Sequence, residues 1–116
     1  MTASEDLQLR SFLRSIMQLL VDEAYLALER LSGGRHLTAA AMEHAVVSYG
    51  RTLRMPSDDL FVSDIVPLAA HPATSWSVVL PLFSLEEGAS DLSLELGIER
   101  LDDGIFRVEI EGLHVR

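Results

Sequence analysis

The sequence predicts an α+β fold, in which two to three N-terminal helices pack on the concave face of a curved antiparallel β-sheet of four to five strands. Three observations support this expectation. Apolar residues recur at helical spacing before residue 51, glycines follow these helical segments, and residues 76–115 largely alternate between apolar and polar side chains. A chain of 116 residues is long enough for one core, so we expect a single domain over residues 1–116.

The first helix is expected to begin close to the start of the chain. Thr2 and Glu5 have the spacing of a capping box, and Ser4 is the alternative cap. Helical spacing then places the following apolar residues on one buried stripe: Leu9, Phe12, Leu13, Ile16, Met17 and Leu20. Two alternatives remain open after this stripe. Either Asp22 caps a second short helix, or one long bent helix continues to Leu31.

Glycines mark the ends of the remaining helical segments. Gly33-Gly34 would end the second segment and Gly50 the last one, because glycine accepts the left-handed conformation that closes a helix. Thr38 is the expected N-cap of the last helix. The buried stripe of that helix would contain Met42, Ala45, Val46 and Tyr49.

Residues 51–75 have the least regular pattern. Residues 52–55 are expected to form a short strand that the following proline ends. Asp58 would cap a single helical turn that reaches Phe61. Residues 65–68 would form an edge strand, because Pro67 has no amide donor for a neighbouring strand.

The clearest strands are residues 91–100 and 106–111, which form a hairpin. Asp102, Asp103 and Gly104 make a three-residue loop, with glycine at the position that favours the left-handed conformation. This loop sets the register of the hairpin. The pairs expected opposite one another are Leu101 and Ile105, Ile98 and Val108, Leu96 and Ile110, Glu99 and Arg107, and Glu95 and Glu111.

The apolar alternation changes phase at Gly112. Leu113 and Val115 would point away from the core if the strand continued without interruption. A β-bulge at Gly112 would return both side chains to the core side and would bend the strand. We therefore expect the sheet to be curved.

The composition excludes several classes of function. The formal net charge is −9, so a nucleic-acid partner is not expected. There is no cysteine, and the four histidines, at positions 36, 44, 71 and 114, lack the spacing of metal ligands. Neither a phosphate-binding loop nor a nucleophile elbow is found. We therefore predict no metal, no cofactor and no catalytic residue, and we favour a role other than catalysis.

No part of the sequence is expected to enter a membrane. The first residues lack the basic and apolar regions of a signal peptide. No apolar run approaches the ~18 residues that a membrane helix needs. We therefore expect a cytoplasmic protein without a membrane partner.

One face of the predicted hairpin is unusually acidic. It carries four glutamates and a single Arg107, and the glutamates are Glu95, Glu99, Glu109 and Glu111. Like charges opposite each other in a sheet cost about 0.2–1 kcal/mol per pair, so folding alone does not require this arrangement. These glutamates are candidates for binding a basic protein partner. The ordinary explanation is a solvated acidic face.

The strand at residues 76–83 is apolar on both faces. If the sheet has one dry face, Val79, Pro81 and Phe83 point away from the core. Contiguous exposed apolar groups are typical of an interface, so these residues are candidates for a homodimer contact. The alternative is that residues 51–65 cover them.

Two resemblances follow from the order of elements and from local phrases. Helices that precede a bulged, curved sheet ending in the strand 106–115 resemble the NTF2-like (cystatin-like α+β) superfamily. The phrases at residues 76–82 and 90–96 resemble those of small uncharacterised bacterial proteins of unknown function. The superfamily includes ketosteroid-isomerase-like enzymes, ligand binders and dimerisation or immunity modules.

The NTF2-like resemblance implies where a pocket would lie. The enzymes of this superfamily place an Asp or a His and a Tyr inside the cone of the sheet. The candidates here are Tyr25, Tyr49, Asp64, His71 and Trp76. For the aromatic residues, packing in the core is the ordinary role.

Three functions are compatible with these observations. We favour a non-enzymatic protein-interaction module, a homodimer of the immunity or adaptor type with a basic partner. The alternative is an NTF2-like small-molecule-binding protein or isomerase-like enzyme, which would need a cone pocket of ~300 Å³ or more. A third is an accessory domain without a ligand.

Overall fold

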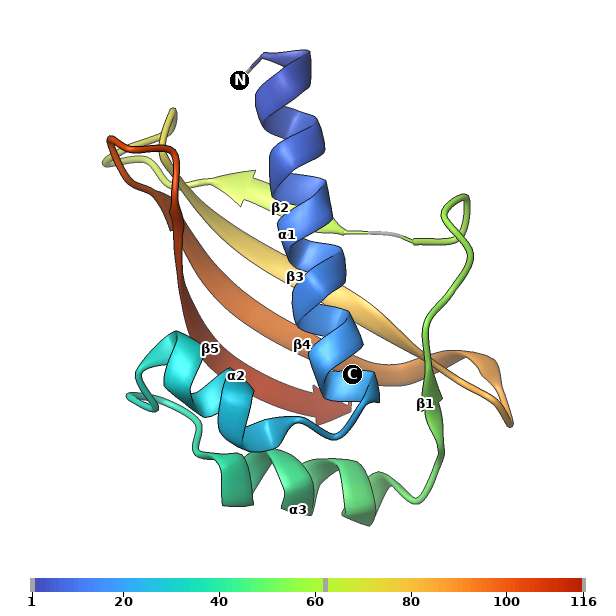
Figure 1. Ribbon diagram of the computed structural model, residues 1–116. Coiled ribbons are helices and arrows are strands. Elements are labelled where there is room, and N and C mark those ends of the chain that lie inside the picture. Colours follow the sequence, from blue (N-terminus) through green and yellow to red (C-terminus); the bar gives the residue numbers. More distant parts are fainter. Residues whose placement is uncertain (1, 62, 116) are drawn as a thin grey trace.

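The computed structural model describes residues 2–61 and 63–115 and confirms the α+β prediction. Within these residues, three helices lie in front of a curved, antiparallel, five-stranded sheet (Figure 1). The elements in chain order are α1 (Ala3–Val21), α2 (Tyr25–Ser32), α3 (Ala39–Tyr49), β1 (Leu53–Arg54), β2 (Asp64–Pro67), β3 (Ser75–Ser84), β4 (Gly88–Arg100) and β5 (Phe106–Val115).

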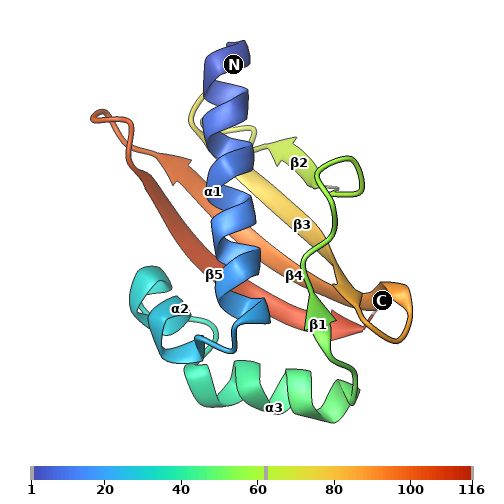
Figure 2. The same cartoon turned by 45° about the vertical axis from the view of Figure 1, so that its right-hand side comes forward.

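Helix α1 crosses the concave face of the sheet, as Figures 1 and 2 show from two directions. The Thr2 hydroxyl oxygen accepts a hydrogen bond from the Glu5 amide at 3.1 Å, which confirms the expected cap. The side chains that α1 buries are at most 1% exposed, and they are Leu9, Leu13, Ile16, Met17 and Leu20. Phe12, the sixth residue of the predicted stripe, is half-buried beside Phe106, with ring centres 5.1 Å apart. The other five residues form the central part of the core.

The helical conformation is interrupted between α1 and α2, so the prediction of two separate helices is confirmed. Asp22 does not cap α2, however. It ends α1, and its carboxylate accepts a hydrogen bond from Gln18 Nε2 at 3.0 Å. Glu23 adopts a left-handed backbone conformation with φ 61°, and α2 starts after Ala24 without a side-chain cap. The chain changes direction at this left-handed residue. The start of α2 is thereby moved beyond the reach of the Asp22 side chain.

The ends of α2 and α3 follow the sequence prediction. Gly33 and Gly50 have φ angles of 76° and 75°, in the left-handed region. Thr38 caps α3 through its hydroxyl oxygen. A carboxylate from α2 adds a second cap, because Glu29 Oε1 accepts a hydrogen bond from the Ala39 amide at 2.8 Å. This bond joins the two helices at their nearest ends.

Strands β1 and β2 both pair with β3, along different parts of its length. They confirm the two short strands expected in residues 52–55 and 65–68. The single helical turn expected between them is a hydrogen-bonded turn in which the Leu60 and Phe61 amides both donate to the Ser57 carbonyl at 3.0 Å. Arg10 of α1 fastens this turn by donating to the carbonyl oxygens of Asp58 and Phe61 at 2.8 and 3.0 Å.

The register of the β4–β5 hairpin is confirmed from its loop to the pair Leu96 and Ile110. The next pair is different. Glu95 lies opposite Gly112, so the predicted pairing of Glu95 with Glu111 is wrong. Glu111 is the extra residue of the bulge, which therefore lies at Glu111–Gly112.

The bulge returns the last residues of β5 to the helix side of the sheet, as expected, but only one of them is buried. Leu113 is 7% exposed, whereas Val115 is 60% exposed. Val115 lies in a shallow hollow beside Ala45 and Tyr49 of α3. No helix in residues 2–61 and 63–115 is long and apolar enough to cross a membrane.

Candidate functional site

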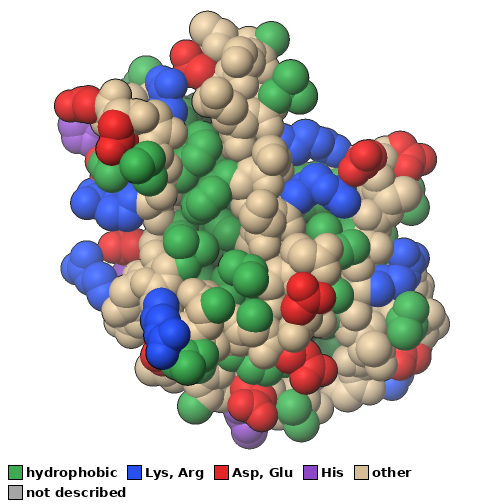
Figure 3. Space-filling view, viewed as in Figure 1, with side chains coloured by type: hydrophobic (Ala, Val, Ile, Leu, Met, Phe, Trp, Pro, Cys, Tyr) green, Lys and Arg blue, Asp and Glu red, His purple; other side chains and the backbone are tan. Residues whose placement is uncertain are grey.

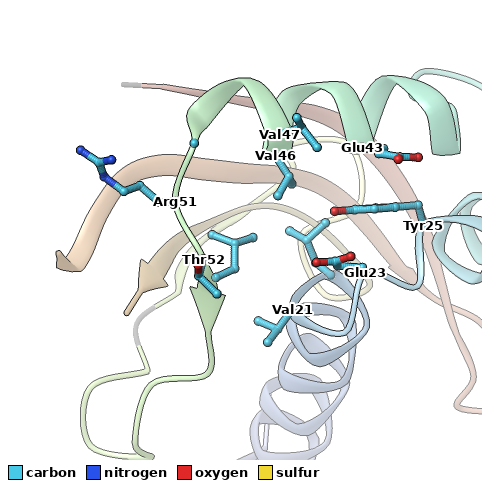
Figure 4. A pocket seen from close by; sticks show the side chains of 11 residues that line it. Val21, Glu23, Tyr25, Glu43, Val46, Val47, Arg51 and Thr52 are labelled. Atoms are coloured by element: carbon cyan, nitrogen blue, oxygen red, sulfur yellow. The ribbon is translucent and has the colours of Figure 1, made fainter. Parts of the chain in front are cut away.

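A hollow of about 190 Å³ lies where α1, α2, α3 and β1 meet. Its apolar wall includes Leu20, Val46 and Leu53. Its polar groups come from the α1–α2 connection, from α2, from α3 and from the segment that enters β1 (Figure 4). They are Glu23, Tyr25, Glu43, Arg51 and Thr52. We refer to this feature as the Tyr25 hollow.

Tyr25 is 9% exposed, and its hydroxyl points into the hollow (Figure 4). Within the described residues, this hydroxyl has no hydrogen-bond partner. Tyr49 is different, because its hydroxyl donates to Glu87 Oε1 at 2.8 Å and accepts a hydrogen bond from the Asp91 amide at 3.1 Å. Burial, and then the negative charges of Glu23 and Glu43, raise the pKa of the Tyr25 phenol above its ordinary value of 10.0.

The carboxylates of Glu23 and Glu43 lie on opposite sides of the Tyr25 ring in Figure 4. Both residues are exposed. The one cationic residue in the wall, Arg51, extends away from the hollow and lies 4.0 Å from Glu87 Oε1. The hollow is therefore negatively charged, with two carboxylates and a phenol around an apolar wall.

The Thr52 edge of the hollow is held by a carboxylate from the β3–β4 turn. Glu86 accepts hydrogen bonds from the Thr52 amide at 2.8 Å and from the Thr52 hydroxyl at 3.0 Å. The amide bond is the main reason why the pKa of Glu86 lies below its ordinary value.

The structure does not bring the five predicted pocket residues together. Of these five, Tyr25 alone lines this hollow, and Tyr49, in the last turn of α3, is engaged with Glu87 instead. Trp76 is 2% exposed in the core on the helix side of β3, whereas Asp64 and His71 are exposed. Between α1 and the β5 side of the sheet, hydrophobic side chains fill the space (Figure 3). The helix thus occupies the place where the cone pocket was expected.

Three of the four predicted partner-binding glutamates already have basic neighbours. The contacts are His114 Nε2 to Glu95 Oε1 at 2.9 Å, Arg107 to Glu99, Arg35 Nη1 to Glu109 Oε1 at 3.1 Å, and His36 Nε2 to Glu109 Oε2 at 3.2 Å. Glu111 lies over Gly97, where a Cβ would come within 2.7 Å of its carboxylate oxygen.

Sequence reasoning missed Arg35, His36 and His114. A count of residues through the bulge could have found His114, which lies opposite Ser93 and therefore near Glu95. No local pattern could have placed Arg35 and His36, because they reach β5 from the α2–α3 connection.

The face of the sheet opposite the helices, here called the outer face, carries an apolar strip. Val79 and Pro81 are half-buried there, but Phe83 is only 9% exposed because the Arg54 guanidinium lies 5.9 Å from its ring centre. Val66 lies on the same face through its pairing with Ser77. The exposed strip, which we call the outer strip, comprises Val66, Leu68, Val79 and Pro81.

Leu68 belongs to this strip because its amide donates to the Ser75 carbonyl at 2.9 Å, which continues the β2–β3 pairing by one residue. Val66 and Leu68 are 53% and 43% exposed. The sequence indicated an edge strand at this position but not its register, in which Asp64 lies opposite Val79 and Val66 lies opposite Ser77.

Comparison with known proteins gives one match. Residues 17–116 match a family described as a domain of unknown function (DUF7668). No curated protein and no solved structure matches the chain.

Proposed function

The chain belongs to this family of unknown function (DUF7668), so we argue its role from its surface. We propose that it is a non-enzymatic protein-interaction module that forms a homodimer through the outer face of its sheet. The outer strip is the observation that supports this proposal. The proposal includes an NTF2-like layout. The order of the elements supports this layout, because the helices come first and the curved sheet follows.

The helices lie on the other face of the sheet, so the outer strip has no helix over it (Figures 1 and 2). Single exposed apolar residues are normal on a protein surface, but a contiguous group is typical of an interface. Val66 and Leu68, like Val79 and Pro81, are two residues apart on one face of their strand, and Val66 lies diagonally across from Val79. The exposed Asp64 lies directly opposite Val79 and borders the strip.

A second copy of the chain suits this strip for a geometric reason. In a two-fold symmetric dimer the same patch meets itself. Packing strip on strip would bring Glu95, which lies opposite Val79, to the rim of the contact. Each copy carries a net charge of −9, so the copies repel each other and salt should strengthen their association by screening this repulsion.

The glutamates of β4 and β5, namely Glu95, Glu99, Glu109 and Glu111, give weaker support to a protein-interaction role. A basic partner of the adaptor or immunity type would have to displace Arg35, His36, Arg107 and His114 from the glutamates. Exchange of existing surface ion pairs yields little free energy, because each is worth about 0–1 kcal/mol. The homodimer is therefore the form of the proposal that the geometry favours.

The test is the mass of the protein in solution, measured by light scattering with increasing concentration and salt. Two copies of the 12.8 kDa chain are expected. Val79→Glu places a charge in the outer strip and should weaken association by about tenfold or more. Val115→Glu is the matched control, since Val115 is 60% exposed on the helix side.

A monomeric mass at about 1 mM protein in high salt would refute the homodimer, since even weak association with a Kd near that value would then show. Equal weakening by both substitutions would refute the assignment to the outer strip. Circular dichroism of each variant confirms that it is folded.

A further inference from the structure

We propose that the Tyr25 hollow binds an organic cation, namely a primary ammonium or a guanidinium group on a short apolar stem. This inference concerns a different surface from the outer strip and does not depend on the homodimer. It combines three observations: a largely buried tyrosine whose hydroxyl opens into the hollow without a partner among the described residues, two carboxylates beside it, and an apolar wall of limited size.

The phenol is the first observation. Tyr25 is 9% exposed, yet within the described residues its hydroxyl has no hydrogen-bond partner. The hydroxyl oxygen itself is open to solvent in the hollow, because Arg14 Nη1 is the one buried side-chain nitrogen or oxygen without a hydrogen-bond partner among the described residues. The Tyr25 hydroxyl points into the hollow, so a ligand with an N–H group could donate a hydrogen bond to it in place of solvent (Figure 4).

The carboxylates decide the charge of that ligand. Glu23 and Glu43 lie beside the phenol, and neither forms a hydrogen bond or ion pair with another described residue. Arg51 is turned toward Glu87 and leaves the hollow without a cation of its own. Two carboxylates and a phenol oxygen are acceptors, and an aromatic ring face also attracts cations. An anion would be repelled here.

The wall decides the size and class of the ligand. Leu20, Val46 and Leu53 can bury an apolar stem. The hollow measures about 190 Å³, less than the ~300–1,000 Å³ of a pocket for drug-sized ligands, so the stem must be short. Metal ions fit less well, because no group of three or more His, Cys, Asp or Glu residues suited to a metal exists among the described residues.

The experiment titrates the full chain with n-butylammonium and follows its amide signals by NMR. Saturable shifts are expected at residues 20–25 and 43–53, with a Kd of roughly 1–10 mM. The pKa of the Tyr25 phenol should fall when the probe is bound, because a nearby cation stabilises the phenolate. Ultraviolet absorbance of a Tyr49→Phe variant isolates this titration.

Three variants locate the binding. Glu23→Gln and Glu43→Gln should each weaken binding by about threefold to fivefold, as expected for solvent-exposed ion pairs. Asp102→Asn removes the same charge from the exposed β4–β5 loop and should leave the affinity unchanged. The absence of saturable shifts would refute the proposal, and so would equal weakening by all three substitutions.

Two further probes define what is recognised. n-Butanol has a similar stem without the charge, and binding as tight as that of n-butylammonium would show that the hollow is merely apolar. Nα-acetyl-lysine methylamide carries the same head group on a polypeptide backbone. If it binds like n-butylammonium, the source of the cation is a side chain of a protein; if it fails to bind, the ligand is a free amine.

Discussion

Leu13→Ala tests whether α1 fills the concave face of the sheet as tightly as described. Leu13 is 0% exposed in the middle of the buried stripe of α1. Its truncation removes three carbon atoms and leaves a cavity between α1 and the sheet. Leu→Ala changes at such sites cost about 2.7–5.0 kcal/mol, depending on how far the surroundings collapse. Because the facing side chains belong to a sheet, which cannot move inward easily, we expect about 3–4 kcal/mol.

The assay is urea unfolding followed by the fluorescence of Trp76, which is the single tryptophan and is 2% exposed. With a slope near 1.5 kcal/mol per M, the expected loss lowers the urea midpoint by about 2–2.7 M. Leu7→Ala is the matched control on the same helix, because Leu7 is 67% exposed. It should change the free energy of unfolding by less than about 0.5 kcal/mol. A cost below about 1 kcal/mol for Leu13→Ala, or equal costs for both, would refute the reasoning.

Two other predictions concern a titration and a helix cap. Burial and two carboxylates raise the pKa of Tyr25, so the folded state holds this proton more tightly than the unfolded chain does. The stability that this proton contributes is complete below pH 10.0 and is lost as the pH rises through the pKa of the folded state. The urea midpoint of Tyr25→Phe should therefore fall less steeply between about pH 9 and pH 12 than the midpoint of the parent protein. Glu29→Ala removes the bond to the Ala39 amide and should lower the free energy of unfolding by about 1 kcal/mol; an unchanged thermal midpoint would contradict it.

Periodicity was sufficient to predict the elements of the fold. The α1 stripe, the Thr38 cap and the hairpin loop at Gly104 depend on residues close together in the chain, and each lies where expected. Pairing beyond the hairpin was harder. The phase change at Gly112 indicated a bulge, but it did not tell whether residue 111 or 112 was the extra one, and this choice decides what lies opposite Glu95.

The candidate sites were less predictable because they depend on contacts between distant segments. Phe83 points outward as expected, but Arg54, which pairs with it from β1, covers its ring. Glu23 and Glu43 meet beside Tyr25 only because the left-handed turn at Glu23 folds α2 and α3 back against the end of α1. Nothing in the local sequence indicates the direction of that turn.

The divided edge of the sheet also affects how copies of the chain can aggregate. An open edge strand offers a row of unpaired amides and carbonyls to other chains, and long flat edges of this kind nucleate fibrils. Here β1 and β2 take up the two parts of the β3 edge, with register at residues 83–84 and 76–79. The uncovered stretch between them contains Pro81, which has no amide to donate. This edge therefore offers an incoming strand only a short and broken template, and strand-by-strand polymerisation is disfavoured there even though the neighbouring outer strip is apolar.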